Sequence, residues 1–280
     1  MKNYTESNRI AWNQTMPKHQ EARGSFWDDK FSQSRFSALS EHEQQHLKTI
    51  GIHGKNVAHL CCNNGVELMS LKNLGAGRCV GFDISDAAVT EATDRAKKFN
   101  IDCEFVRTDV YEISDTFDNE FDLVYISIGC FGWMPDINNF MKVVSKLLKT
   151  HGKLFVYEQH PFADMLSEDG DSEADPLKII GSYFKSEPYE DNQGIDYIGK
   201  SRFESNTSYW FVWTLSDVMT AILDSQLEIR CFKEYEKDIS ASHGRNERAE
   251  ISIPLSYILI AEKSHNQSVL TTPDATRPTS

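Results

Sequence analysis

Three polar positions stand at intervals in the first half of the chain, each at the end of a short apolar run. The segment VAHLCCNNG, residues 57–65, ends in a turn at Gly65, whose backbone N–H groups would face a ligand at the start of a helix. Asp83 follows about 20 residues later, where a carboxylate can accept hydrogen bonds from both hydroxyls of a ribose. Asp109, in RTDVY, follows the next run, where a side chain can meet the amine of an adenine. A loop and two acids in this order predict a site for an adenosyl group.

These positions fall within a regular alternation of strand-like and helix-like segments. The strand-like runs are NVAHLCC, RCVGFDIS, DCEFVRTDV, FDLVYISIG and KLFVYEQHP. The helical runs are VELMSLKNLG, DAAVTEATDRAKKFN, which Ser85 should cap, and INNFMKVVSKLLKTHG, which should end at Gly152. Such alternation predicts an α/β fold with a parallel, doubly wound sheet. Right-handed crossovers then bring the carboxyl ends of the strands to one edge, where the loop and the two acids should meet.

The segments on either side of this alternation differ in character. Residues 1–54 are predicted to form a polar, helical cap with scattered aromatic side chains. At about 162–212 an acidic loop, SEDGDSEADP, and many aromatic residues indicate an inserted lid. A helix with a Thr214–Asp217 capping box and two antiparallel strands then complete a main domain over 55–263. The end, 264–280, is rich in Ser, Thr and Pro and is expected to be a flexible tail.

The composition narrows the class of partner. The chain has 29 basic and 42 acidic residues, a net charge of -13, which disfavours binding to nucleic-acid backbones. No charged leader opens the sequence, and no apolar stretch of about 18 residues occurs. We therefore expect a soluble, cytoplasmic protein with a small-molecule partner, no membrane contact and six reduced cysteines. Nothing in the sequence indicates the oligomeric state.

The stretch 57–160 resembles a class I S-adenosylmethionine-dependent methyltransferase. VAHLCCNNG stands in register with the usual first motif, V-L-D-L-G-C-G-T-G, while GFDIS and RTDVY resemble the second and third motifs. FDLVYISIGCFGWMPDI resembles the fourth strand with its loop, and LLKTHGKLFVYEQHP resembles the turn and fifth strand that follow. The His–Leu–x–Cys loop, WMPD, E-x-HP and the opening NRIAWN resemble a bacterial branch of small-molecule-type methyltransferases.

The resemblance implies a fold, a cofactor and a reaction. The fold is a doubly wound, mostly parallel, seven-stranded Rossmann-like sheet with an antiparallel C-terminal strand. The cofactor is S-adenosylmethionine, and the reaction is in-line transfer of its sulfonium methyl group to an O, N or S nucleophile of a small molecule. The cofactor-binding residues implied are His59, Cys61, Asn63, Gly65, Asp83, Ile84, Thr108, Asp109, Val110 and Ser127.

Three of the departures of the first motif from the family pattern bear on the cofactor. Cys61 and Asn63 stand where glycines are usual, which argues more against a dinucleotide than against S-adenosylmethionine, because the latter has no pyrophosphate to approach closely. Asn63 also adopts positive φ more easily than most residues. His59 replaces the acid that usually serves the amino-acid end of the cofactor. It either contacts the cofactor carboxylate or packs as a core histidine.

The acceptor side of the site is less specified. A base is needed only when the acceptor carries a proton, and His160, after the fifth strand, is the expected base or acceptor-orienting group. The alternative is a loop histidine fixed before Pro161. Aromatic faces favour a sulfonium through cation–π attraction. The expected acceptor-binding residues, with packing as the alternative for each, are Trp12, His19, Trp133, Tyr183, Tyr209 and Trp213.

Two rival functions remain open at this point. HEQQH, residues 42–46, matches the zinc-peptidase pattern, with His42 and His46 as ligands and Glu43 as base, but no third ligand stands in register. We therefore expect no metal site. The second rival is a non-catalytic protein that binds an adenosyl ligand with the same fold. Methylation of RNA is disfavoured by the acidic composition.

Overall fold

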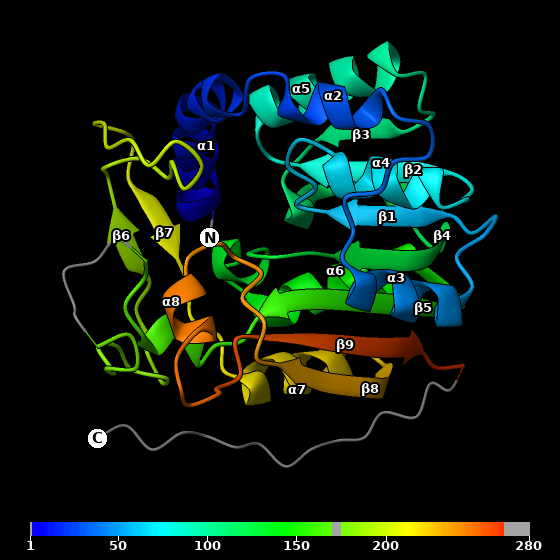
Figure 1. Ribbon diagram of the computed structural model, residues 1–280. Helices are drawn as coiled ribbons and strands as arrows, with labels where there is room; N and C mark the ends of the chain where they lie inside the picture. Colours follow the sequence, from blue (N-terminus) through cyan, green and yellow to red (C-terminus); the bar gives the residue numbers. More distant parts are fainter. Residues whose placement is uncertain (1, 170–174, 266–280) are drawn as a thin grey trace.

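Seven strands form the main sheet of the computed structural model, which describes residues 2–169 and 175–265 (Figure 1). They are β1 (Val57–Leu60), β2 (Cys79–Asp83), β3 (Glu104–Arg107), β4 (Phe121–Ile126), β5 (Leu148–Gln159), β8 (Leu227–Tyr235) and β9 (Ser256–Lys263). Their order in space is β3-β2-β1-β4-β5-β9-β8. The first five pair in parallel, and β9 runs antiparallel between β5 and β8. The predicted α/β fold with a mostly parallel, doubly wound sheet is therefore confirmed.

Helices cover both faces of this sheet. They are α3 (Glu41–Ile50), α4 (Val66–Asn73), α5 (Asp86–Lys98), α6 (Ile137–Leu147) and α7 (Leu215–Asp224). Side chains alternate along β4, so that Leu123 and Tyr125 pack on the side of α3 and α4. Val124 and Ile126 pack on the side of α6 and α7. Because both faces are covered, β4 is almost entirely apolar.

Two helix starts carry the caps that the sequence predicts. The Ser85 hydroxyl accepts a hydrogen bond from Ala88 N at 3.2 Å and so begins α5 directly after β2. At α7 the Thr214 hydroxyl accepts from Asp217 N at 3.1 Å, and the Asp217 carboxylate accepts from Thr214 N at 3.1 Å. This reciprocal pair is the expected capping box.

The end of α6 lies earlier in the chain than predicted. The helical run was expected to reach Gly152, but α6 ends at Leu147 and β5 begins at Leu148. Leu148 pairs with Phe121 of β4, and the register shifts after that pair. A Cβ at Gly152 would lie 2.8 Å from Lys149 O, so glycine permits the irregular start of the strand. Pairing with the sheet here overrides local helix propensity.

A long N-terminal helix, α1 (Lys2–Arg23), crosses the edge of the sheet at which the parallel strands end (Figure 1). On one side the Asn13 side chain accepts a hydrogen bond from the Ser85 hydroxyl at 2.8 Å. On the other, Asn8 accepts from Tyr209 N at 2.7 Å and donates to Tyr209 O at 3.1 Å. A short helix, α2 (Phe26–Phe31), follows. The α1 helix thus bridges α5 and the inserted segment.

The inserted segment contains a small antiparallel sheet, β6 (Tyr189–Asp191) and β7 (Ser208–Trp210). It rests on the loop after β4, since Phe211 N donates to Gly132 O at 2.7 Å and Trp213 Nε1 donates to Met134 O at 2.9 Å. The remaining short helices are η1 (Val110–Glu112), η2 (Asp115–Phe117), η3 (Phe131–Trp133), η4 (Ala163–Met165) and α8 (Gly244–Glu247). This segment therefore borders the edge that α1 crosses.

Three sequence expectations concern regions that the structure describes only in part. From residue 266 on, the expected tail lies outside the described residues, as do residues 170–174 of the acidic loop. The division into cap, main domain and insertion stays a prediction. Within the described ranges, no helix combines the length and the apolar character that a membrane span requires.

Candidate active site

The loop after β1 turns through three residues in the left-handed conformation. The φ angle is 54° at Cys61, 46° at Asn63 and 74° at Gly65. A Cβ on Gly65 would lie 2.5 Å from the Phe105 ring, so this glycine answers both a conformational and a steric need. Asn63 adopts the positive φ that the sequence suggests. The turn of a cofactor loop is present although two of its usual glycines are not.

Asp83 is fixed at the end of β2 by backbone groups on both sides. Its Oδ2 accepts a hydrogen bond from Asn63 N at 2.7 Å, and its Oδ1 accepts from Ser85 N at 2.8 Å. Burial raises its pKa, while these bonds and one from the Ile84 amide act in the opposite direction. A carboxylate has about four acceptor sites, so each oxygen keeps capacity for a ligand hydroxyl. The loop and the acid are therefore held as one unit.

Asp109 lies next to this unit. Thr108 N donates to Asp83 O at 2.9 Å, which places β3 beside β2 at the same edge. The Asp109 Oδ1 accepts from Tyr111 N at 3.0 Å and caps η1, and Val110 is buried in the core. One carboxylate oxygen thus has a capping role while the other stays available.

His59, the last but one residue of β1, is a neutral core histidine. Its ring is 1% exposed, and its Nε2 lies 3.2 Å from the Ser127 hydroxyl at the end of β4. Among the described residues its Nδ1 has no hydrogen-bond partner. Burial lowers its pKa to about 3, so the ring carries no charge at neutral pH. It cannot supply the negative charge of the acid that it replaces.

Glu158 shapes the loop that follows β4. Its carboxyl group accepts hydrogen bonds from Gly129 N and, at 3.3 Å, from Phe131 N. The side chain is 4% exposed, and burial raises its pKa to about 7. Sequence reasoning missed this role, although the E-x-HP pattern contains the residue. The anchored loop carries Trp133.

Aromatic side chains from three separate segments meet around Trp133. Its ring centroid lies 5.4 Å from that of Trp12 on α1 and 5.0 Å from that of Trp210 on β7. His19 lies 6.0 Å from Trp12 and 4.6 Å from Tyr197, again between ring centroids. Trp12, His19 and Trp133 are thus brought together as expected. Trp210 belongs to the aromatic lid that the sequence indicates, whereas Tyr197 was missed because no spacing in the sequence links it to the others.

The other three expected acceptor residues have structural contacts elsewhere. The Tyr183 hydroxyl accepts a hydrogen bond from Leu215 N at 3.1 Å. The Tyr209 ring packs 4.8 Å from that of Tyr4, between centroids. Trp213 donates to the backbone of the loop after β4. These contacts agree with the packing alternative, and an acceptor role for them stays a prediction.

Comparison with known proteins identifies the domain. Residues 57–152 match the family model of a methyltransferase domain. These residues therefore form a methyltransferase domain. It includes the loop after β1, Asp83 and Asp109, so the three positions lie inside the matched segment.

Solved structures share the fold of most of this chain. A Listeria monocytogenes protein described as an S-adenosylmethionine-dependent methyltransferase is 19% identical, with a TM-score of 0.59 over 79% of this chain and 98% of its own. An S-adenosylmethionine-dependent methyltransferase from Mesorhizobium loti is 18% identical, with a TM-score of 0.58 over 79% and 97%. An uncharacterized protein of Methanocaldococcus jannaschii is 36% identical over 63 residues, which span 22% of this chain and 29% of that relative.

Buried polar atoms around the methyltransferase domain fit a polar ligand. In the described part of the chain, Thr15 Oγ1, His19 Nδ1 and His59 Nδ1 are buried without a hydrogen-bond partner. Such atoms carry a desolvation cost that a bound polar group would offset. Thr15 and His19 lie one helical turn apart on α1, beside Trp12, and His59 is the last but one residue of β1. The residues present therefore fit S-adenosylmethionine, while the role of each stays a prediction.

His160 is hydrogen-bonded through both ring nitrogens. Phe162 N donates to its Nδ1 at 3.1 Å, and its Nε2 lies 3.1 Å from Glu234 Oε1 on β8. Burial lowers its pKa, against the favourable charge of Glu234. With Nδ1 accepting and Nε2–H donating, neither nitrogen keeps a free lone pair for a proton. This geometry favours the alternative, a loop histidine fixed before Pro161.

Substitution tests the two roles of His160. We expect His160→Ala to lower the free energy of unfolding by about 1–3 kcal/mol, because Glu234 and Phe162 N lose a buried partner. Turnover by the folded variant should change less than about threefold, well short of the usual effect of losing a general base. Urea unfolding and initial rates measure both. A loss of about 100-fold in turnover, with stability and cofactor affinity unchanged, would instead establish His160 as the base.

The HEQQH segment is used to pack α3 on the sheet. Glu43 caps the helix by accepting from Ser40 N at 2.7 Å and also accepts from the Tyr125 hydroxyl. His46 Nε2 lies 3.2 Å from the Tyr235 hydroxyl, and the His42 ring packs on the same tyrosine. Within residues 2–169 and 175–265, no three His, Cys, Asp or Glu side chains gather as a metal site. Each residue of the motif thus has a structural partner.

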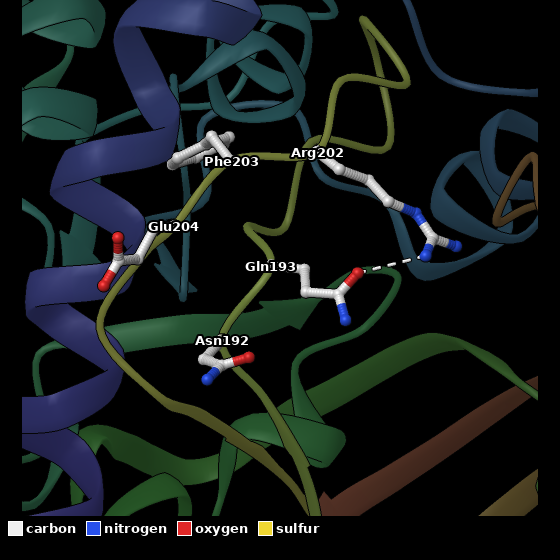
Figure 2. A pocket seen from close by; sticks show the side chains of 5 residues that line it. All are labelled: Asn192, Gln193, Arg202, Phe203 and Glu204. Carbon is white, nitrogen blue, oxygen red and sulfur yellow. Dashed lines mark hydrogen bonds between the residues drawn. The ribbon is translucent and has the colours of Figure 1, made fainter.

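A shallow, open pocket lies in the inserted segment (Figure 2). It is lined by Asn192, Gln193, Arg202, Phe203 and Glu204. Figure 2 shows Arg202 reaching to Gln193, to which it donates a hydrogen bond at 3.0 Å. None of the expected cofactor or acceptor residues lines it. The pocket therefore adds nothing to the site.

Proposed function

We propose that this chain binds S-adenosylmethionine at the carboxyl edge of β1, β2 and β3 and methylates a small-molecule acceptor beneath α1 and the inserted segment. The observation that carries the proposal is Asp83, held between Asn63 N and Ser85 N with acceptor capacity to spare. A fixed carboxylate of this kind suits the two hydroxyls of a ribose. Asp109, one strand further along, is suitably placed for the adenine amine.

The protein contributes orientation and exclusion of water. When bound, S-adenosylmethionine supplies an electrophilic methyl group on a sulfonium. The loop after β1 and Asp83 would hold its adenosyl part, while Trp12 and Trp133 present aromatic faces that favour a cation. Because α1 and the inserted segment cover the edge, the acceptor would lie in a space from which water is partly excluded. Water then competes less with the nucleophile of the acceptor for the methyl group.

Three observations support a small acceptor and a cytoplasmic setting. The aromatic cluster is closed by α1 and β7, so little room is left for a macromolecule. The net charge of -13 opposes a nucleic-acid substrate. The six cysteines are free thiols, as is usual in a reducing compartment.

Calorimetric titration with S-adenosylmethionine and S-adenosylhomocysteine tests the proposal. We expect micromolar binding, and a loss of about 100-fold in Asp83→Ala, because two charge-assisted hydrogen bonds disappear. Asp83→Asn should give a smaller loss and shows whether the fold tolerates the change. Asp115→Ala is the matched control, since Asp115 is an exposed carboxylate after β3 that pairs with Lys146.

The outcomes separate the rival functions. Binding together with methyl transfer to members of a small-molecule library would establish the enzyme. Binding without transfer to any acceptor would favour the non-catalytic adenosyl-binding protein. No binding of either ligand by folded protein would overturn the proposal.

A further inference from the structure

The amino-acid end of S-adenosylmethionine needs a partner that the first motif does not supply. That end carries an ammonium and a carboxylate group. His59 stands where the family usually has an acid, and burial keeps this histidine neutral. Asp83 is already committed to the loop and suits the ribose. A negative charge for the ammonium group must therefore come from another residue.

Glu67 is a partly buried residue whose carboxyl group has no ion-pair partner among the described residues. It lies in the first turn of α4, two residues after Gly65, and among the described residues its side chain forms no ion pair and bonds only its own backbone amide. Burial raises its pKa to about 7. The charge of Arg23 lowers that pKa less than Glu43 and burial raise it, and Arg23 is bonded to Glu91 at 3.3 Å. The carboxyl group is thus held in a low-dielectric place with no cation of its own.

The surroundings of Glu67 connect the loop to the cap. Its charge acts on the hydroxyl of Tyr125, which packs against His59, and on the hydroxyl of Tyr197, which packs against His19. The same Tyr197 is affected by Asp83. The charge of Glu67 therefore acts on two tyrosines, one that contacts His59 of β1 and one that contacts His19 of α1.

Unpartnered atoms on the two histidines that these tyrosines contact point independently to a polar ligand. His59 Nδ1 and His19 Nδ1 belong to rings that are 1% and 0% exposed, and neither atom has a hydrogen-bond partner within the described ranges. Neutral imidazole nitrogens can donate to or accept from a ligand according to tautomer. A ligand that carries both an ammonium and a carboxylate group would satisfy the carboxyl of Glu67 and these nitrogens together.

We propose that Glu67 binds the α-ammonium group of S-adenosylmethionine and so takes over the role that an acid at position 59 plays elsewhere. This inference rests on the proposed function. Glu67 is a binding residue for the cofactor and takes no part in the transfer itself. A charge-assisted hydrogen bond to an ammonium group, in a place shielded from water, is worth more than a neutral one.

The test is a cycle of two proteins and two ligands, measured by calorimetry. The proteins are the full chain and Glu67→Gln. The ligands are S-adenosylhomocysteine and its analogue that lacks only the α-amino group. We expect Glu67→Gln to weaken the binding of S-adenosylhomocysteine by about 10- to 100-fold. The affinity for the analogue should change by less than about threefold. Such coupling isolates the pair of groups.

Controls distinguish this inference from the proposed function and from misfolding. Glu91→Gln removes a nearby carboxylate that already pairs with Arg23 and Arg95, so the ratio of the two affinities should stay constant. The thermal midpoint of Glu67→Gln should not fall, because an unpaired buried acid is lost. If Glu67→Gln weakens the binding of both ligands equally, or weakens the binding of neither, the role of Glu67 is overturned and the proposed function still stands. Failure of the unaltered protein to bind either ligand would overturn the proposed function itself.

Discussion

Gly65→Ala should destabilise the protein by about 2–5 kcal/mol and abolish measurable cofactor binding. The new Cβ would meet the Phe105 ring at 2.5 Å and the Ala92 Cβ at 2.9 Å, while φ stays at 74°. Left-handed backbone costs a non-glycine residue about 1–2 kcal/mol, and overpacking a core adds about 1–3 kcal/mol. The loop amide of Asn63, which positions Asp83, would move with the turn. Urea unfolding and calorimetric titration measure the two effects.

Gly51→Ala separates strain from collision. Gly51 has a φ of 77°, close to that of Gly65, but nothing lies within 4 Å of a Cβ placed there. We expect a loss of only about 1 kcal/mol and unchanged cofactor affinity. If the two variants lose the same stability, the contact with Phe105 contributes nothing to the loss. That result would contradict tight packing of the loop against β3.

Glu158→Gln should remove a pH dependence of about 3 kcal/mol from the stability of the protein. The pKa of Glu158 rises from 4.5 in the unfolded chain to about 7 in the fold. A raised pKa means that the folded state binds the proton more tightly, so the contribution is complete below pH 4.5 and is lost as pH rises through 7. One pKa unit corresponds to about 1.4 kcal/mol. The stability of the unaltered protein relative to Glu158→Gln should therefore fall between pH 5 and pH 8.

The difference between the two proteins is needed because other groups titrate in the same range. Burial lowers the pKa of His19, His59 and His160, and these side chains make stability rise with pH. Their effect cancels when the variant is subtracted, since Glu158 bonds to backbone amides and not to any of these rings. Burial and the charge of Glu158 also raise the pKa of Asp164 to about 7, so the two proteins are compared in an Asp164→Asn background, where this coupled group is absent. Urea unfolding at four pH values between 5 and 8 gives the difference. Parallel profiles would mean that Glu158 is ionised in the fold and that its backbone hydrogen bonds fully offset burial.

The order of elements was predictable because each strand and helix carries its own local signal. Apolar runs marked the strands, Ser85 marked a helix start, and the Thr214–Asp217 pair marked another. The end of α6 was wrong because the pairing of Leu148 with β4 is a contact that local propensity does not contain. The fold class and the turn after β1 were thus within reach of the sequence.

The candidate site likewise has a part that the sequence predicts and a part that it does not. Gly65, Asp83 and Asp109 follow successive strands, so topology alone brings them together. Glu158 and Tyr197 were missed because their contacts depend on burial or on segments that lie far apart in the sequence. His160 appeared suited to catalysis from its position after β5, yet its partner Glu234 comes from β8, which no pattern in the sequence connects to it.

The bridge made by α1 has a consequence for how the site is assembled. The hydrogen bonds that fix its outer end join residues about 200 positions apart, Ser7 and Asn8 to Asn206, Thr207 and Tyr209. Contacts of such long sequence separation form late in folding, because closing a large loop costs entropy before any contact compensates it. During synthesis, α1 emerges about 200 residues before its partners and must wait for them. The edge of the sheet can therefore form first, and α1 docks over that edge last.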